Sequence, residues 1–185
     1  MAMMLPSSLP LMRLFAKASA KQPRPRAAMA GFLGGYALVW TAFGALAFGF
    51  DIGVHAAVDA SPWLESHEWF LAAGVLVLAG AFQFSSLKYA CLDKCRHPAQ
   101  FMLRFYRRGA GGGLRLGLRH GLFCLGCCWA LMLVMFSVGV ASLLAMAALT
   151  ALMVHEKTQP GGRRVVPVAG ATLFATAMMI AVYSA

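Results

Sequence analysis

Long apolar runs separated by short charged segments dominate the chain, near residues 28–50, 69–87, 114–136, 140–155 and 165–184. An α-helix rises about 1.5 Å per residue, so about 20 apolar residues cross the roughly 30 Å core of a bilayer. The interval between Arg119 and Glu156 holds no charge and is short for two spans. We therefore expect a tight turn near residues 137–142, where Gly139 supplies backbone freedom. The pattern predicts an all-α, polytopic transmembrane helical bundle with five complete spans.

Composition supports this class. The chain is 61% hydrophobic and 12% charged, with a mean hydropathy of +0.72, which is typical of polytopic membrane proteins. Residues 1–15 are too short to span and lack the basic region and cleavage site of a signal peptide. We interpret them as the remnant of a helix whose start is missing, giving an N-terminal partial helix. Residues 1–185 are then expected to form a single membrane-embedded domain.

The charges predict the orientation. Basic residues cluster in residues 13–26, 88–119 and 156–164, whereas residues 51–68 carry four acids and no base. The positive-inside rule places the basic segments in the cytoplasm and residues 51–68 outside, with the C-terminus also outside. We expect residues 88–113 to be a cytoplasmic basic loop, with a flexible linker at residues 109–113. The predicted location is the bacterial inner membrane.

The same distribution bears on partners. Topology accounts for the whole net charge of +10, so we expect no nucleic acid among the partners. In residues 101–108 aromatic and basic side chains interleave, which favours contact with anionic lipid headgroups. The sequence indicates no oligomeric state.

Five cysteines and a histidine form the main candidate site. Three of the thiols and the imidazole lie on one helical face, within an arc of roughly 100° and about 12 Å of axis. The cytoplasmic side is reducing, so metal binding is favoured over disulfides. Thiolates select Cu(I), and two closely spaced Cys pairs leave Zn(II) as the alternative. The predicted metal ligands are Cys91, Cys95, His120, Cys124, Cys127 and Cys128.

The metal hypothesis carries a geometric expectation: Cys91 or Cys95 should approach the thiols of residues 124–128 within a few ångströms. Nearby methionines, Met3, Met4 and Met12, add soft thioethers. Packing thiols are one alternative, and redox chemistry or palmitoylation of Cys91 and Cys95 is another.

Other residues support weaker readings. His55 and His67 flank the acidic segment, which is either a hard-metal or proton site or a solvated loop. The Gly117–Gly121 step predicts close helix packing. Lys88 either lowers the pKa of a nearby thiol or anchors its helix at the headgroups, and Arg119 has the same two readings.

The residues from Gln83 to Pro98 and from Gly117 to Met132 carry a resemblance to a known family. With Gly-Cys-Cys-Trp at its centre, the chain resembles the predicted metal-binding integral membrane proteins grouped as domain of unknown function 2182. The resemblance implies membrane location and metal binding, and it supplies no reaction.

Two functions follow as hypotheses. The first is a metal-handling protein, a transporter or a chaperone that exchanges copper with a donor or acceptor protein. The second is a structural or assembly subunit whose cysteines are packing groups. An enzyme ranks third, because no catalytic constellation is recognisable.

Overall fold

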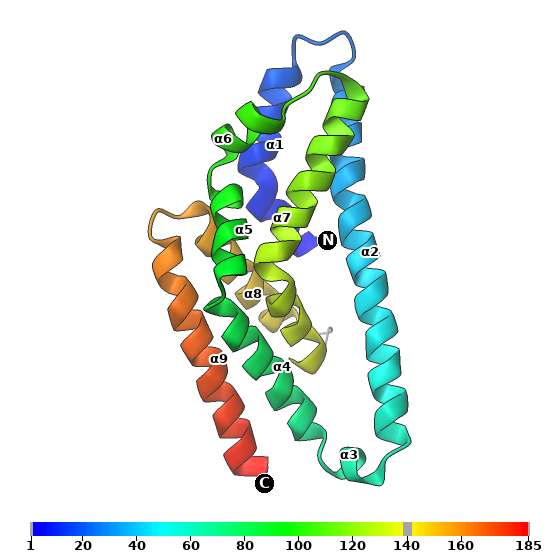
Figure 1. Cartoon of the computed structure of the whole chain (residues 1–185), viewed down its shortest axis with the longest axis vertical. Helices are drawn as coiled ribbons and strands as arrows, with labels where there is room; N and C mark the ends of the chain where they lie inside the picture. The colour runs from blue at the N-terminus through cyan, green and yellow to red at the C-terminus, as the bar shows by residue number, and fades with distance from the viewer. Residues whose placement is uncertain (1, 139–141, 185) are drawn as a thin grey trace. The chain divides into compact units, whose positions relative to one another are not determined.

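The computed structural model describes residues 2–138 and 142–184, and within them it shows helices and no strand (Figure 1). The elements are η1 (Ala2–Met4), α1 (Leu5–Ser19), α2 (Pro25–Asp59), α3 (Pro62–Ser66), α4 (Glu68–Gln83), α5 (Ser86–Arg96), α6 (Pro98–Phe105), α7 (Gly109–Val138), α8 (Leu143–Thr158) and α9 (Gly162–Ser184). The expected all-α class is thereby confirmed.

Local chemistry explains several boundaries. Proline stands in the first turn of α1, α3 and α6, where a missing N–H costs nothing. Between α4 and α5 the chain bends by 64°, and the Ser85 hydroxyl accepts from the Lys88 backbone N–H at 3.2 Å. That contact caps the new helix. Gly109, with φ of +81°, adopts the left-handed conformation from which α7 starts.

Three described helices are long and apolar enough to cross a membrane: α2, α7 and α9. The bent pair α4–α5 raises this to four if it is counted as one broken span. Helix α8 has 16 residues and a length of about 24 Å, short of the roughly 30 Å core. Helices suited to a membrane are thus confirmed, while five complete spans stay a prediction.

The described contacts divide the chain into two compact units. Unit 1 comprises Met1–Phe43 and Tyr89–Cys127, and unit 2 comprises Gly44–Lys88 and Cys128–Ala185. We expected one domain, and each unit is described by itself below.

In unit 1, α2 and α7 pack backbone to backbone. A Cβ added at Gly117 would collide with the carbonyl oxygen of Phe32, and one added at Gly35 would collide with that of Leu114. The predicted close packing at Gly117 is therefore present. Helices α1 and α6 lie side by side (Figure 1), and buried Phe15, Phe32 and Phe101 belong to one hydrophobic cluster.

In unit 2, α4 and α9 run side by side (Figure 1). Gly80 and Gly170 allow the approach, since a Cβ at Gly170 would lie 2.6 Å from the ring of Phe84. Leu76, Ala130 and Ala177 are among the residues of its buried cluster.

Two expectations need correction or restriction. Residues 109–113, predicted as a flexible linker, are the first turns of α7; only Gly109 keeps a non-helical φ. The close approach of Gly113 to the backbone of Ala28 shows that packing, rather than flexibility, requires a glycine at this position. The predicted turn at 137–142 falls largely on residues 139–141, which lie outside the described residues.

Candidate functional site

The cysteines lie on α5 and α7 as free thiols. Cys124, Cys127 and Cys128 expose 0–1% of their surface, and Cys91 exposes 8%. Cys95 follows Cys91 by one helical turn and is half-buried. Helical spacing of the α7 cysteines therefore directs all three thiols into the protein.

Cys91 meets α7 at Gly126. A Cβ added to Gly126 would lie 2.7 Å from the Cys91 sulfur, well inside the ordinary contact range of 3.4–4 Å. The absence of a side chain at Gly126 thus allows Cys91 Sγ to rest on the α7 backbone. Cys127 follows Gly126 directly on α7, so Cys91 of α5 lies beside the backbone that carries Cys127.

Cys127 and Cys124 have different local partners. The Cys127 thiol donates to the carbonyl oxygen of Cys124 at 3.1 Å, a bond within one helical turn. The Cys124 sulfur lies 3.6 Å from the Tyr36 hydroxyl. Tyr36 is fully buried on α2, so this contact joins the cysteine face to a second helix.

Tyr36 belongs to a hydrogen-bond network that reaches the N-terminal segment. Its hydroxyl donates to the Met4 carbonyl oxygen at 3.2 Å and accepts from the Ser8 hydroxyl at 3.2 Å. Ser8 Oγ is also 3.0 Å from His120 Nε2. Ser7 donates to the same Met4 carbonyl at 2.9 Å. The network therefore connects α1, α2 and α7.

His120 is 3% exposed and surrounded by aromatic rings. It stacks on Phe32 and Tyr36, at centroid distances of 6.1 and 5.7 Å, and meets the edge of Phe101 at 5.9 Å. The Ser8 hydroxyl donates its proton to Tyr36. In the His120–Ser8 contact the N–H at His120 Nε2 is therefore the donor, and the Ser8 oxygen is the acceptor. The imidazole is thus built into the hydrogen-bond network on the cysteine face.

In unit 2, Cys128 faces a lysine. Lys157 Nζ donates to Cys128 Sγ at 3.9 Å. The neighbouring Glu156 forms an ion pair of 2.8 Å with Lys88, with side chains 1% and 0% exposed. Lys88 is therefore buried, and its predicted anchoring at the headgroups is wrong. The signal that could have revealed the pair is the position of both charges at the ends of apolar runs.

The arrangement bears on the predicted metal site. Among the described residues, no group of three or more His, Cys, Asp or Glu side chains is placed to hold a metal ion. The four-ligand cage that structural zinc requires is thus not formed by these residues. The six predicted ligands fall in four places: Cys91 lies beside the α7 backbone that carries Cys127, Cys124 and His120 belong to the Tyr36 network, Cys128 contacts Lys157, and Cys95 is half-buried on α5. Their role as metal ligands stays a prediction.

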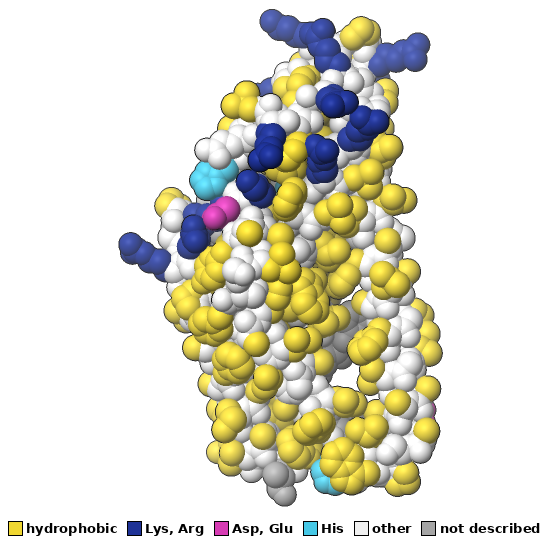
Figure 2. Space-filling model, in the orientation of Figure 1, with side chains coloured by type: hydrophobic (Ala, Val, Ile, Leu, Met, Phe, Trp, Pro, Cys, Tyr) yellow, Lys and Arg dark blue, Asp and Glu magenta, His cyan; other side chains and the backbone are white. Residues whose placement is uncertain are grey.

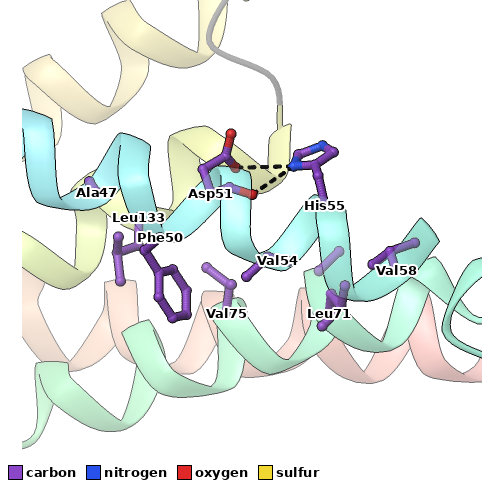
Figure 3. Close-up of a pocket in the computed structure, with 10 residues that line it drawn as sticks. Ala47, Phe50, Asp51, Val54, His55, Val58, Leu71, Val75 and Leu133 are labelled. Atoms are coloured by element: carbon purple, nitrogen blue, oxygen red, sulfur yellow. Dashed lines mark hydrogen bonds and ion pairs between the residues drawn. The ribbon is translucent and has the colours of Figure 1, made fainter. Parts of the chain in front are cut away.

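A separate cavity of about 270 Å³ lies in unit 2. Apolar side chains of α2 and α4, among them Phe50, Val54 and Val75, point into it (Figure 3). At its rim, His55 Nδ1 lies 3.8 Å from the Asp51 carboxylate (Figure 3). No cysteine lines the cavity.

The acidic segment contains the other predicted histidine. His67 Nδ1 lies 2.8 Å from the carbonyl oxygen of Trp63 and 2.8 Å from the Ser66 hydroxyl. His67 thus contacts the helix that it follows, and His55 contacts Asp51 one turn earlier in its own helix. The described residues of this segment show no metal-binding group.

The chain was also compared with known proteins. A family model, PpoB2, described as a copper chaperone, matches residues 1–180. No curated protein and no solved structure gives a significant match. The family match confirms the expected metal-related, copper-related class. The more specific resemblance to domain of unknown function 2182 stays a prediction.

Proposed function

Because the chain belongs to the PpoB2 copper chaperone family, we propose that it is an integral membrane protein that binds Cu(I) between Cys91 and Cys127 for delivery to a partner protein. The approach of Cys91 to α7 at Gly126 carries this proposal. It sets Cys91 of α5 beside the residue that precedes Cys127 on α7, at a position that their spacing of 36 residues along the chain does not itself determine.

Two sulfur ligands suit Cu(I). Thiolates are soft donors that select Cu(I) over harder ions, and a d¹⁰ ion accepts two-coordinate binding. Cys91 and Cys127 are both buried, so water and oxygen ligands compete little with sulfur. A binuclear or four-coordinate site needs more converging ligands than the described residues provide. This reasoning favours copper over the zinc alternative.

Cys124 offers the next thiol. It lies three positions before Cys127, which places the two about 4.5 Å apart along the helix axis and within about 60° around it. An ion held by Cys127 therefore has a further sulfur within one helical turn. Cys95 and His120 stay candidates of lower rank in this proposal, which leaves out Cys128 because its thiol contacts Lys157.

A delivery role fits the restricted distribution of the thiols. All five lie between residues 91 and 128, on α5 and in the middle of α7, and none lies in a segment that we predict to be outside. A complete conduit would need ligands at both ends of the spans. We therefore propose exchange with a donor or acceptor protein from the cytoplasmic side, and not transport through the bilayer.

The membrane orientation rests on charge. Unit 1 holds twelve Lys and Arg residues and one acid, Asp93. On the face shown in Figure 2, Lys and Arg side chains gather over α1, α6 and the first turns of α7. By the positive-inside rule we place the basic residues of unit 1 in the cytoplasm, with residues 51–68 and the C-terminus outside. The proposed location is the bacterial inner membrane, with anionic lipid headgroups around the basic residues.

Metal analysis tests the proposal. Wild type, Cys91→Ser and Cys127→Ser are purified in parallel under reducing conditions and loaded with Cu(I), and copper and zinc are counted. Serine preserves size but replaces a soft thiolate with a hard hydroxyl. We expect one copper per wild-type chain and a loss of most of it in both variants.

Cys128→Ser is the matched control, because its thiol is equally buried on the same helix and contacts Lys157. It should retain copper. Equal copper content in all four proteins, or none in the wild type, would favour packing thiols instead.

A further inference from the structure

Delivery poses a problem of access. Copper moves between proteins by direct exchange of ligands, so a thiol of the partner must reach the bound ion. Cys124, Cys127 and Cys91 expose only 0%, 1% and 8% of their surface. In the closed structure a partner cannot reach them. Some segment must move aside for the proposed function to operate.

Tyr36 covers Cys124, and the residues that hold Tyr36 are identifiable. Cys124 Sγ touches the Tyr36 hydroxyl, and that hydroxyl is held by Met4 and Ser8 of the N-terminal segment. Met4 and Ser8 are each 1% exposed. We propose that residues 4–8 form a latch that holds Tyr36 over Cys124, and that its release opens Cys124 to the partner that exchanges copper. This proposal rests on the proposed copper delivery and adds its regulation.

The latch is fastened in part by hydroxyl groups. Ser8 bridges two helices, because it donates to Tyr36 of α2 and accepts from His120 of α7. The Met4 carbonyl accepts from Tyr36 and from Ser7. The loss of one neutral hydrogen bond of this kind shifts an opening equilibrium about fivefold. Removal of the Ser8 hydroxyl should therefore loosen the hold on Tyr36 without unfolding the helices.

The turns of α1 that follow the latch are held in place by packing. Leu11 and Phe15 are buried in the cluster of unit 1, and Phe15 stacks on Phe32 at 5.3 Å. Pro10 lies inside α1 and removes one helical hydrogen bond just after the latch. The missing bond lets residues 4–8 shift relative to the packed residues after Pro10.

Thiol accessibility tests the latch without copper. The metal-free full chain in detergent is treated with a small, permeant maleimide, and alkylation of each cysteine is followed by tandem mass spectrometry. Ser8→Ala removes the bridge and should raise the alkylation rate of Cys124 about fivefold or more, since one hydrogen bond is lost on each side. Cys128, which belongs to unit 2, serves as the internal reference and should not change.

Ser19→Ala is the matched control. Ser19 is also a buried serine of α1, 1% exposed, but its hydroxyl makes no hydrogen bond. Its substitution should leave the rate at Cys124 unchanged. Tyr36→Phe gives a second variant that keeps the ring, with Tyr106→Phe as its control, because Tyr106 bonds to Ala18 and Gln22 and touches no thiol.

The outcomes separate the two proposals. Faster alkylation of Cys124 in Ser8→Ala and Tyr36→Phe, but in neither control, supports the latch whether or not copper binds. Equal rates in all variants overturn the latch, even if the wild type binds copper through Cys91 and Cys127. For the copper-loaded protein, the latch predicts that Ser8→Ala also hands Cu(I) to a soluble chelator faster than Ser19→Ala does.

Discussion

Gly126→Ala is the sharpest perturbation of the copper site, because it changes no ligand. The new Cβ would lie 2.7 Å from Cys91 Sγ, whereas ordinary contact begins at 3.4 Å. The sulfur must therefore withdraw by about 0.7 Å, several times the roughly 0.2 Å tolerance of metal–ligand distances. We expect Cu(I) affinity to fall at least 10- to 100-fold, by analogy with other losses of ligand positioning.

The effect on stability should be small by comparison. Overpacking costs about 1–3 kcal/mol, and replacing a helical glycine with alanine returns about 1 kcal/mol. The variant should therefore fold with a modestly lower melting temperature. Gly111→Ala is the control, since it lies on the same helix with open space around it. It should leave copper binding unchanged and stability equal or higher.

The assay is competition for Cu(I) with a colorimetric chelator, run on wild type, Gly126→Ala and Gly111→Ala at one protein concentration. If Gly126→Ala competes as well as the wild type, Cys91 does not bind copper from its place on the α7 backbone. The reasoning from the glycine contact would then be refuted.

Two further predictions concern the buried ion pair and the topology. Glu156→Gln should destabilise the protein by about 3–5 kcal/mol, because it leaves the buried Lys88 charge unpaired. The double substitution Lys88→Met/Glu156→Leu should recover most of this loss. Thermal unfolding in detergent measures both effects, and an unchanged stability of Glu156→Gln would contradict the pairing. Cysteines introduced at the exposed positions Ala60 and Ala110 should react with an impermeant maleimide from outside and from the cytoplasm, respectively. Labelling of position 60 from the cytoplasmic face would reverse the orientation.

Periodicity and charge predict much of the fold but not its breaks. Apolar runs indicate the helices correctly, because every backbone group in lipid must be satisfied within a helix. The fourth run, expected near residues 140–155, has the length of α8 but lies three residues before its position at Leu143–Thr158, since no charge marks the beginning of this helix. The glycines of residues 109–113 look like a linker in sequence, yet Gly113 is needed for the close approach of α7 to α2.

The shared face of the α7 thiols was predictable from the sequence, and their partners were not. Helical spacing places these thiols on one face, which is a local property. The contacts of Ser8 with Tyr36 and His120 join residues 28 and 112 positions apart, and no pattern in one sequence encodes them. The Lys88–Glu156 pair spans 68 positions; the ends of the apolar runs mark each charge as unusual, but they do not show which charge pairs with which.

X-ray absorption at the copper edge of the loaded, reduced wild type tests the central claim most directly. The proposed site predicts Cu(I) with two or three sulfur neighbours at roughly 2.2–2.3 Å and no nitrogen or oxygen neighbour at shorter distance. Cys91→Ser and Cys127→Ser should each remove this signal. A first shell of nitrogen or oxygen at about 2.0 Å, or a sulfur shell that survives both substitutions, would contradict a copper site between α5 and α7.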